Sequence, residues 1–169
     1  MDERPAGLAS HYLYPCMLFA HRNEHVVSTV LGSCVTVCLR DPVLELGGVN
    51  HYMLPLWNGE GLPTPKYGNI AIDKLIQKML CLGCVRERLA AKLFGGANVI
   101  GTGQGLFPVG ARNIILAREM LALEGIPIIA SDVGGEFGRK LIYNTRTGLA
   151  LVSLLRARDG QTLVGRMPG

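Results

Sequence analysis

Residues 25–39, with the sequence HVVSTVLGSCVTVCL, contain the two strand-like runs around which the rest of the chain can be arranged. The run from His25 to Leu31 is rich in β-branched residues, and the run from Val35 to Leu39 alternates with a period of two, as strands do. Gly32-Ser33-Cys34 separates the runs. We therefore predict two strands joined at a sharp turn that carries a cysteine.

Further strands and two helices are predicted on either side of this core. The helices, expected over residues 69–82 and 111–123, have apolar residues at helical spacing and glycines just beyond their ends. Strand-like runs occupy residues 46–54, 89–94, 126–130, 139–144 and 148–155. Helical crossovers permit parallel pairing and short turns demand antiparallel pairing, so we expect an α/β fold. Its predicted form is a single-domain layered sandwich with a mixed β-sheet and two main helices.

The domain organisation follows from length and composition. The chain has 169 residues, the size of one domain, and we assign residues 14–155 to it. Residues 1–13 are expected to form an N-terminal segment, and the polar, glycine-rich residues 156–169 a loose tail. Hydrophobic residues make up 49% of the chain and charged residues 18%, which excludes a disordered protein.

The compartment is inferred from the N-terminus and the thiols. The first residues lack the basic start of a signal peptide, and the apolar stretch Leu13–Ala20 is far shorter than the ~20 residues that span a bilayer. Five cysteines cannot all pair with one another. We expect a cytoplasmic protein with reduced thiols and no membrane insertion. The net charge of +4 is only mildly basic.

Cys34 is the residue whose setting is most suggestive of chemistry. A turn between strands can expose a side chain and leave backbone N–H groups free to stabilise an oxyanion. A cysteine nucleophile also needs a base, and His51 lies in a predicted neighbouring strand. Free cysteines are also commonly buried as small apolar residues, and a histidine in an apolar strand is often a structural one. The residues alone leave both interpretations open.

Three other sequence patterns indicate a function less strongly than Cys34 and His51 do. Cys81 and Cys84 form a CxxC at the end of a helix, whereas redox motifs open helices and a zinc site needs two further ligands. Residues 101–105, GTGQG, lack the spacing of a dinucleotide-binding turn. The positive charges are scattered, which disfavours nucleic-acid binding. Packing at the helix end is the simpler interpretation of Cys81 and Cys84, and a flexible loop is the simpler interpretation of residues 101–105. No metal is expected.

Ordered stretches of the chain resemble the chemoreceptor glutamine deamidase family, CheD. The resemblance covers residues 14–155, nearly the whole domain. It is carried by LGSCV at residues 31–35, CLRDP at 38–42, HYMLP at 51–55, KY at 66–67, AKLFGGA at 91–97, GARN at 110–113, DVGGEFGR at 132–139 and TG at 147–148.

This resemblance implies a protein-glutamine glutaminase that hydrolyses selected glutamine amides of chemoreceptor cytoplasmic domains to glutamate and releases ammonia. It implies no cofactor, and an α/β sandwich related to cysteine-dependent deamidating toxins. Cys34 would be the nucleophile and His51 the base. A hydroxyl residue six positions before the cysteine would orient the imidazole, which points to Ser28, although Thr29 stands beside it.

The resemblance also implies a second class of function. Members of the family can act as a regulatory binding partner of a CheC-type chemotaxis phosphatase, whose docked helix can mimic the receptor. A protein with only this binding role would tolerate loss of Cys34, whereas a deamidase would not. Cys38 is expected to be packed, and Cys16, Cys81 and Cys84 to be structural.

Overall fold

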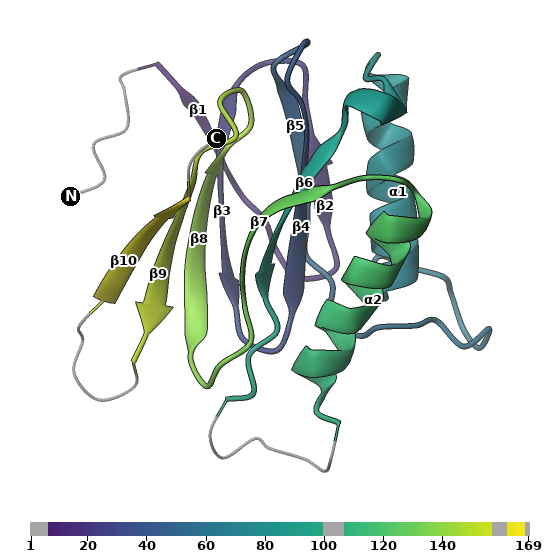
Figure 1. The fold of residues 1–169 in the computed structure, drawn as a ribbon, viewed down its shortest axis with the longest axis vertical. Coiled ribbons are helices and arrows are strands. Elements are labelled where there is room, and N and C mark those ends of the chain that lie inside the picture. The colour runs from purple at the N-terminus through teal and green to yellow at the C-terminus, as the bar shows by residue number, and fades with distance from the viewer. Residues whose placement is uncertain (1–6, 100–106, 157–161, 168–169) are drawn as a thin grey trace.

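The computed structural model describes residues 7–99, 107–156 and 162–167 and has three layers (Figure 1). Two five-stranded sheets lie face to face, and two helices cover the outer face of one of them. The helices are α1 (Gly68–Cys81) and α2 (Val109–Leu123), with a short 3-10 turn η1 (Arg86–Arg88). The strands are β1 (Ala9–Tyr12), β2 (Leu18–Ala20), β3 (His25–Leu31), β4 (Val35–Asp41), β5 (Leu46–Asn50), β6 (Ala90–Gly95), β7 (Ile128–Val133), β8 (Gly138–Asn144), β9 (Ala150–Leu155) and β10 (Thr162–Met167).

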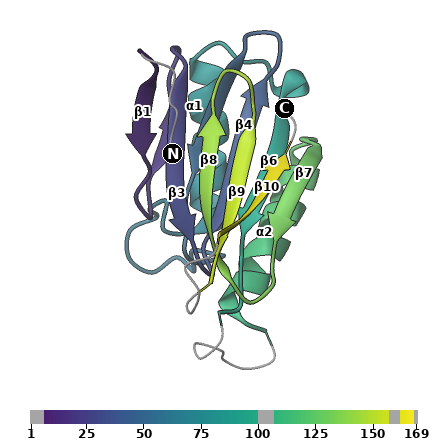
Figure 2. The same ribbon diagram turned by 90° about the vertical axis from the view of Figure 1, so that its left-hand side faces the viewer.

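The strand order shows how the chain divides between the sheets. The first sheet has the order β1-β3-β8-β9-β10 (Figure 2), and the second has the order β2-β5-β4-β6-β7. Each is mixed, because β1–β3 and β6–β7 are parallel and the other pairs are antiparallel. The predicted α/β layered fold with two helices is confirmed. The strands nevertheless form two sheets where one was expected, because the chain passes from one sheet to the other at residues 32–34.

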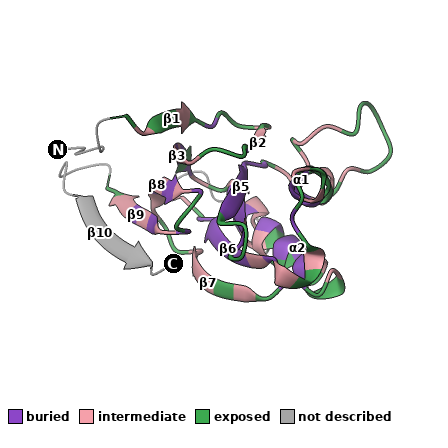
Figure 3. Cartoon of the chain, turned by 90° about the horizontal axis from the view of Figure 1, so that it is seen from above, coloured by how far each residue is buried: buried purple, intermediate pink, exposed green. Residues whose placement is uncertain are grey.

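Two apolar clusters hold the layers together. One lies between the helices and the second sheet and includes Leu75, Met79 and Leu93. The other lies between the sheets and includes Val27, Leu31 and Phe94. The central strands of the second sheet are covered on both sides, and β5 and β6 are almost wholly buried (Figure 3).

Both ends of the expected domain need correction. Strand β1 pairs with β3, and Leu13 is completely buried, so part of the segment assigned to the N-terminus belongs to the first sheet. At the other end, β10 pairs antiparallel with β9, where a loose tail was expected. The short run of β-branched and apolar residues beginning at Thr162 provides a strand that covers the edge of β9. Neither helix in the described part of the chain is long and apolar enough to cross a membrane.

Asp41, at the C-terminal end of β4, stabilises the end of the second sheet that is farthest from residues 32–34. Its buried carboxylate accepts hydrogen bonds from the side chain of Arg88 and from the main-chain N–H groups of Val43, Leu44 and Val85. Burial acts to raise the pKa of Asp41, but these donors outweigh it and hold the pKa below its ordinary value. One side chain thus joins the β4–β5 turn to the segment after α1.

We predict that Asp41→Asn lowers the free energy of unfolding by about 1–3 kcal/mol, because an amide N–H₂ then faces buried donors. Urea unfolding followed by circular dichroism measures this. The control is Asp73→Asn on the exposed face of α1, which should change the free energy by less than about 0.5 kcal/mol. Equal effects of the two substitutions would contradict the role of Asp41.

Candidate active site

Cys34 and His51 are brought together by the pairing of the strand ends next to them. Val35 donates a hydrogen bond to the carbonyl of Tyr52 (3.1 Å), and Tyr52 donates one to the carbonyl of Val35 (3.0 Å). This pair continues the register of β4 with β5, in which Cys38 lies opposite Val49. Cys34 and His51 therefore lie diagonally across the two strands on the same face, at a typical Cα separation of about 7–8 Å.

The face that carries this pair looks into the space between the sheets. Val35 and Tyr52 belong to the cluster on the helix side. Because side chains alternate along a strand, Cys34 and His51 point the other way, and Cys34 packs against the cluster between the sheets. The strand register therefore places the two side chains on one face, but Nε2 of His51 has no hydrogen-bond partner among the described residues, so the thiol is not hydrogen-bonded to it.

A hydrogen-bond chain fixes which nitrogen of His51 carries the proton. Thr29 donates its hydroxyl proton to the carbonyl of Leu13 (2.7 Å), and its oxygen lies 2.7 Å from Nδ1 of His51. A hydroxyl has only one proton, so Nδ1–H must donate to Thr29 and Nε2 must carry the lone pair. Nε2 is buried and has no hydrogen-bond partner among the described residues. This is the arrangement that a base requires.

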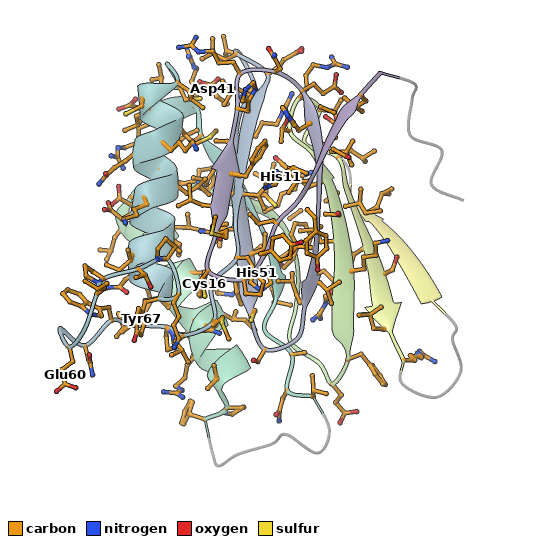
Figure 4. The ribbon with its side chains drawn as sticks, turned by 180° about the vertical axis from the view of Figure 1, so that it is seen from behind. His11, Cys16, Asp41, His51, Glu60 and Tyr67 are labelled. Atoms are coloured by element: carbon orange, nitrogen blue, oxygen red, sulfur yellow. The ribbon has the colours of Figure 1, made fainter. Side chains whose placement is uncertain are left out.

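The main chain of His51 is also held on the side away from β4. Its N–H donates to the carbonyl of Met17 (3.0 Å), and its carbonyl accepts from the N–H of Cys16 (2.8 Å). Cys16 and His51 accordingly lie close together (Figure 4). Residues 16–17 thus hold the main chain of His51, and Thr29 holds its ring.

The hydroxyl that orients the imidazole belongs to Thr29, which corrects the expectation for Ser28. Along β3 the residues Val27, Thr29 and Leu31 are buried between the sheets. Ser28 is out of phase with them and lies on the opposite face of its strand. Ser28 stands six positions before the cysteine but on the other face of β3. Residues 27–31 carry apolar side chains on both faces of the strand, so the sequence contains no signal that selects Thr29.

Electrostatics make the resting pair uncharged at neutral pH. Burial lowers the pKa of His51 from 6.5 to about 4, so the imidazole is neutral. Burial also raises the pKa of the Cys34 thiol to about 11. The neighbouring thiol of Cys16 acts in the same direction, and the backbone N–H of Cys34 itself acts in the opposite direction. A thiolate would thus form only when a proton moves to Nε2.

Cys16 is closer to the site than its sequence indicated. Its φ angle is +68°, which is unusual for a residue other than glycine, and such conformations gather at functional sites. Its thiol lies 3.5 Å from the sulfur of Met53, the residue opposite Cys34 in the strand register. The sequence assigned Cys16 only a structural role, because nothing in its neighbours predicts a left-handed backbone there.

The turn that carries Cys34 is held by the end of β6. Gly96 donates to the carbonyl of Cys34 (2.8 Å), and Ala97 donates to the carbonyl of Gly32 (2.9 Å). Gly95 has a φ of +101°, and a Cβ atom there would lie only 2.2 Å from the carbonyl oxygen of Cys34. Gly95 is therefore required by the close approach of the backbone to this turn, and Gly96 by its approach to α2.

The competing motifs do not form a second site in the described residues. Cys81 is exposed at the end of α1, Cys84 is buried, and neither forms a disulfide. No three histidine, cysteine or acidic residues of the described ranges are grouped so that they could hold a metal. Residues 101–105 lie outside the described part of the chain.

A groove lies beside the strand end that carries His51. Its volume is about 510 Å³, and it is open to solvent between α2 and the residues that follow His51. It is lined by Leu54, Pro55, Leu56, Asn58, Tyr67, Arg112, Ile115, Leu116 and Glu119. The groove therefore has an apolar surface with charged groups of both signs, and it lies on the helix side of the second sheet, whereas Cys34 packs between the sheets.

The fold and the site define a layered α/β protein with a cysteine and a histidine between its sheets. The family model described as CheD chemotactic sensory transduction matches residues 53–154. The chain belongs to the CheD family, as the resemblance of its motifs indicated.

Curated relatives carry the same family name over most of their length. A probable chemoreceptor glutamine deamidase CheD of Trichlorobacter lovleyi is 48% identical over 89% of this chain and 94% of its own length. A probable chemoreceptor glutamine deamidase CheD of Sulfurimonas denitrificans is 46% identical over 88% of this chain and 96% of its own. Probable chemoreceptor glutamine deamidase CheD 1 of Anaeromyxobacter dehalogenans is 41% identical over 88% and 86%.

We predict that Thr29→Val changes the tautomer of His51. The variant keeps the shape of the side chain but removes the oxygen that accepts the Nδ1 proton, so the Nε2–H form becomes populated. Nitrogen-15 NMR of labelled histidine distinguishes the two forms. Ser28→Ala is the matched control and should leave the His51 signals unchanged. A response to Ser28→Ala and none to Thr29→Val would identify Ser28 as the residue that orients the imidazole.

The lowered pKa of His51 predicts a pH-dependent stability. Between about pH 6.5 and pH 4 the unfolded chain binds a proton at this residue that the folded chain does not, so stability falls as the pH falls. From pH 7 to pH 4 the loss is about 3 kcal/mol. Urea unfolding of wild type and His51→Asn at both pH values isolates this contribution. An equal loss in the two proteins would contradict it.

Proposed function

We propose that the chain hydrolyses selected glutamine side-chain amides of chemoreceptors to glutamate and releases ammonia. The observation that carries this proposal is the buried, proton-free Nε2 of His51 on the same strand face as Cys34. The curated relatives described above are named chemoreceptor glutamine deamidases. A thiol with a neutral base beside it suits attack on an amide carbon.

The first half of the proposed reaction forms a thioester. The thiol proton of Cys34 moves to Nε2 of His51 while the sulfur attacks the carboxamide carbon of the glutamine. The Nδ1–H bond to Thr29 keeps the ring in place and shares the positive charge that develops on it. Negative charge on the amide oxygen is stabilised by the backbone N–H of Cys34. The C–N bond then breaks, and the amine leaves with the proton from Nε2 as ammonia.

The second half releases glutamate. A water molecule that enters after ammonia gives a proton to Nε2, and its oxygen attacks the thioester carbon. The C–S bond breaks, and the sulfur takes the proton back from the imidazole. The sum is one amide and one water converted into one carboxylate and one ammonium ion. Apart from this water, each step uses only the thiol of Cys34 as nucleophile and the imidazole of His51 as proton acceptor and donor.

The groove on the helix side of the second sheet offers a contact surface for a protein substrate. Leu54 and Leu116 present apolar surface there, and Arg112 and Glu119 add charges of both signs. We propose that side chains flanking the target glutamine rest in this groove. A chemoreceptor substrate presents its glutamines to the cytoplasm, so we place the protein in that compartment, where thiols stay reduced.

The alternative role, as a binding partner of a CheC-type phosphatase, is not favoured over catalysis. The relatives quoted above are named as deamidases, and the orientation of His51 through Thr29 serves proton transfer and has no use in a purely binding surface. A phosphatase partner therefore stays a prediction for the same surface.

We predict that Cys34→Ala abolishes conversion of glutamine to glutamate. The assay incubates the protein with a cognate receptor cytoplasmic fragment, follows ammonia release, and locates each converted residue by mass spectrometry. Cys81→Ser, at the exposed end of α1, is the control and should retain full activity. Conversion by Cys34→Ala at the wild-type rate would refute the nucleophile, and a wild-type protein inactive on every cognate receptor would refute the proposed reaction.

A further inference from the structure

Asn113 connects α2 to the two strand ends that carry the thiol and the imidazole. Its side chain is completely buried in the first half of the helix. Nδ2 donates one hydrogen bond to the carbonyl of Ser33 (3.0 Å) and one to the carbonyl of Met53 (3.0 Å). Both protons of the amide are used, and they are used on two different strand ends.

The two carbonyls need this partner because they lie just beyond the strand pairing. Val35 and Tyr52 form the last mutual pair of the ladder, so Ser33 and Met53 lie past its end. The amide of Asn113 supplies these carbonyls with the donors that a further pair of the ladder would otherwise supply. The hydroxyl of Tyr52 in turn donates to the carbonyl of Asn113 (2.6 Å), which fixes the helix turn that presents the amide.

The bond to Ser33 determines the direction of the Cys34 N–H group. The Ser33 carbonyl and the Cys34 N–H belong to the same planar trans peptide, so they point in opposite directions. When Asn113 draws the carbonyl toward α2, the N–H is turned away from the helix. It then acts on the sulfur of Cys34 itself and favours the thiolate.

The other bonds at this turn do not orient that peptide directly. Gly96 and Ala97 bind the carbonyls of Cys34 and Gly32, which belong to the peptides on either side. The peptide between Ser33 and Cys34 is held through its carbonyl by Asn113. Loss of the amide would therefore free the one peptide that carries the proposed oxyanion donor, while the turn around it stays anchored.

We propose that Asn113 is a positioning residue that presets the Cys34 N–H as the oxyanion donor, an inference that rests on the proposed deamidation. Asn113 touches neither substrate nor reacting atoms. It acts through the Ser33–Cys34 peptide, and through Met53 it keeps that peptide in register with the strand of His51. Its effect therefore falls on the chemical step rather than on substrate binding.

The test compares wild type, Asn113→Leu and Asn113→Ser with Met79→Ala as a control that weakens the core beside α1. Asn113→Leu removes both donors without adding charge, and Asn113→Ser is too short to reach both carbonyls. Rates are measured on a receptor cytoplasmic fragment well below each melting temperature. Alkylation of Cys34 by iodoacetamide is followed from pH 6 to 11 by mass spectrometry of its peptide, which needs no receptor.

Both Asn113 variants should lower kcat about 10- to 100-fold with KM changed less than about twofold, because a misdirected oxyanion donor costs part of the 10²–10³ that its removal costs. The alkylation profile of Cys34 should move to higher pH, since its N–H no longer favours the thiolate. Met79→Ala should lower the melting temperature and leave kcat and the profile unchanged. If only one Asn113 variant folds, that variant carries the comparison.

A wild-type kcat in a folded Asn113 variant would overturn the proposal, as would a change confined to KM or an equal fall of kcat in Met79→Ala. The alkylation measurement separates this failure from that of the proposed reaction. If wild type converts no receptor, the deamidation is refuted; a shifted alkylation profile in the Asn113 variants then still supports the orientation of the N–H, and an unshifted one overturns it.

Discussion

The hydrogen-bond chain from His51 through Thr29 to Leu13 is the constraint on which the site depends. It crosses between the two sheets, because Thr29 belongs to β3 and His51 follows β5. A buried imidazole is costly unless its polar atoms are paired, so the inter-sheet layer must place the hydroxyl and the carbonyl correctly. The packing of the sheets and the protonation of the base are therefore fixed together.

In the proposed reaction, burial of His51 favours proton transfer at the expense of stability. An exposed imidazole would be partly protonated near neutral pH, whereas this one stays neutral and ready to accept a proton. The same burial leaves Nε2 without a partner in the described part of the chain, which a purely structural histidine would not tolerate well. Unpaired buried groups in native proteins call for a functional explanation, and transfer of the Cys34 proton provides one.

Much of the architecture was predictable from local patterns, and the errors arose where distant segments meet. The β-branched content of residues 25–31, the alternation of residues 35–39 and the helical spacing around Leu75 correctly located β3, β4 and α1. No local pattern states that β3 and β4 belong to different sheets, because that depends on which strands pair with them. For the same reason, Thr29 and Asn113 become visible as partners of the site only when residues far apart in sequence are placed side by side.

The position of Cys34 at the crossing between the sheets explains why so many constraints meet there. The turn at residues 32–34 leaves the first sheet and enters the second, so its geometry is set from both. Sheet pairing fixes Leu31 on one side and Val35 on the other, and β6 and α2 hold the carbonyls between them. A loop anchored at one end could move its cysteine away from the base. A crossing anchored on both sides keeps the thiol and its backbone N–H in a fixed orientation to His51, which electrostatic preorganisation of the reaction requires.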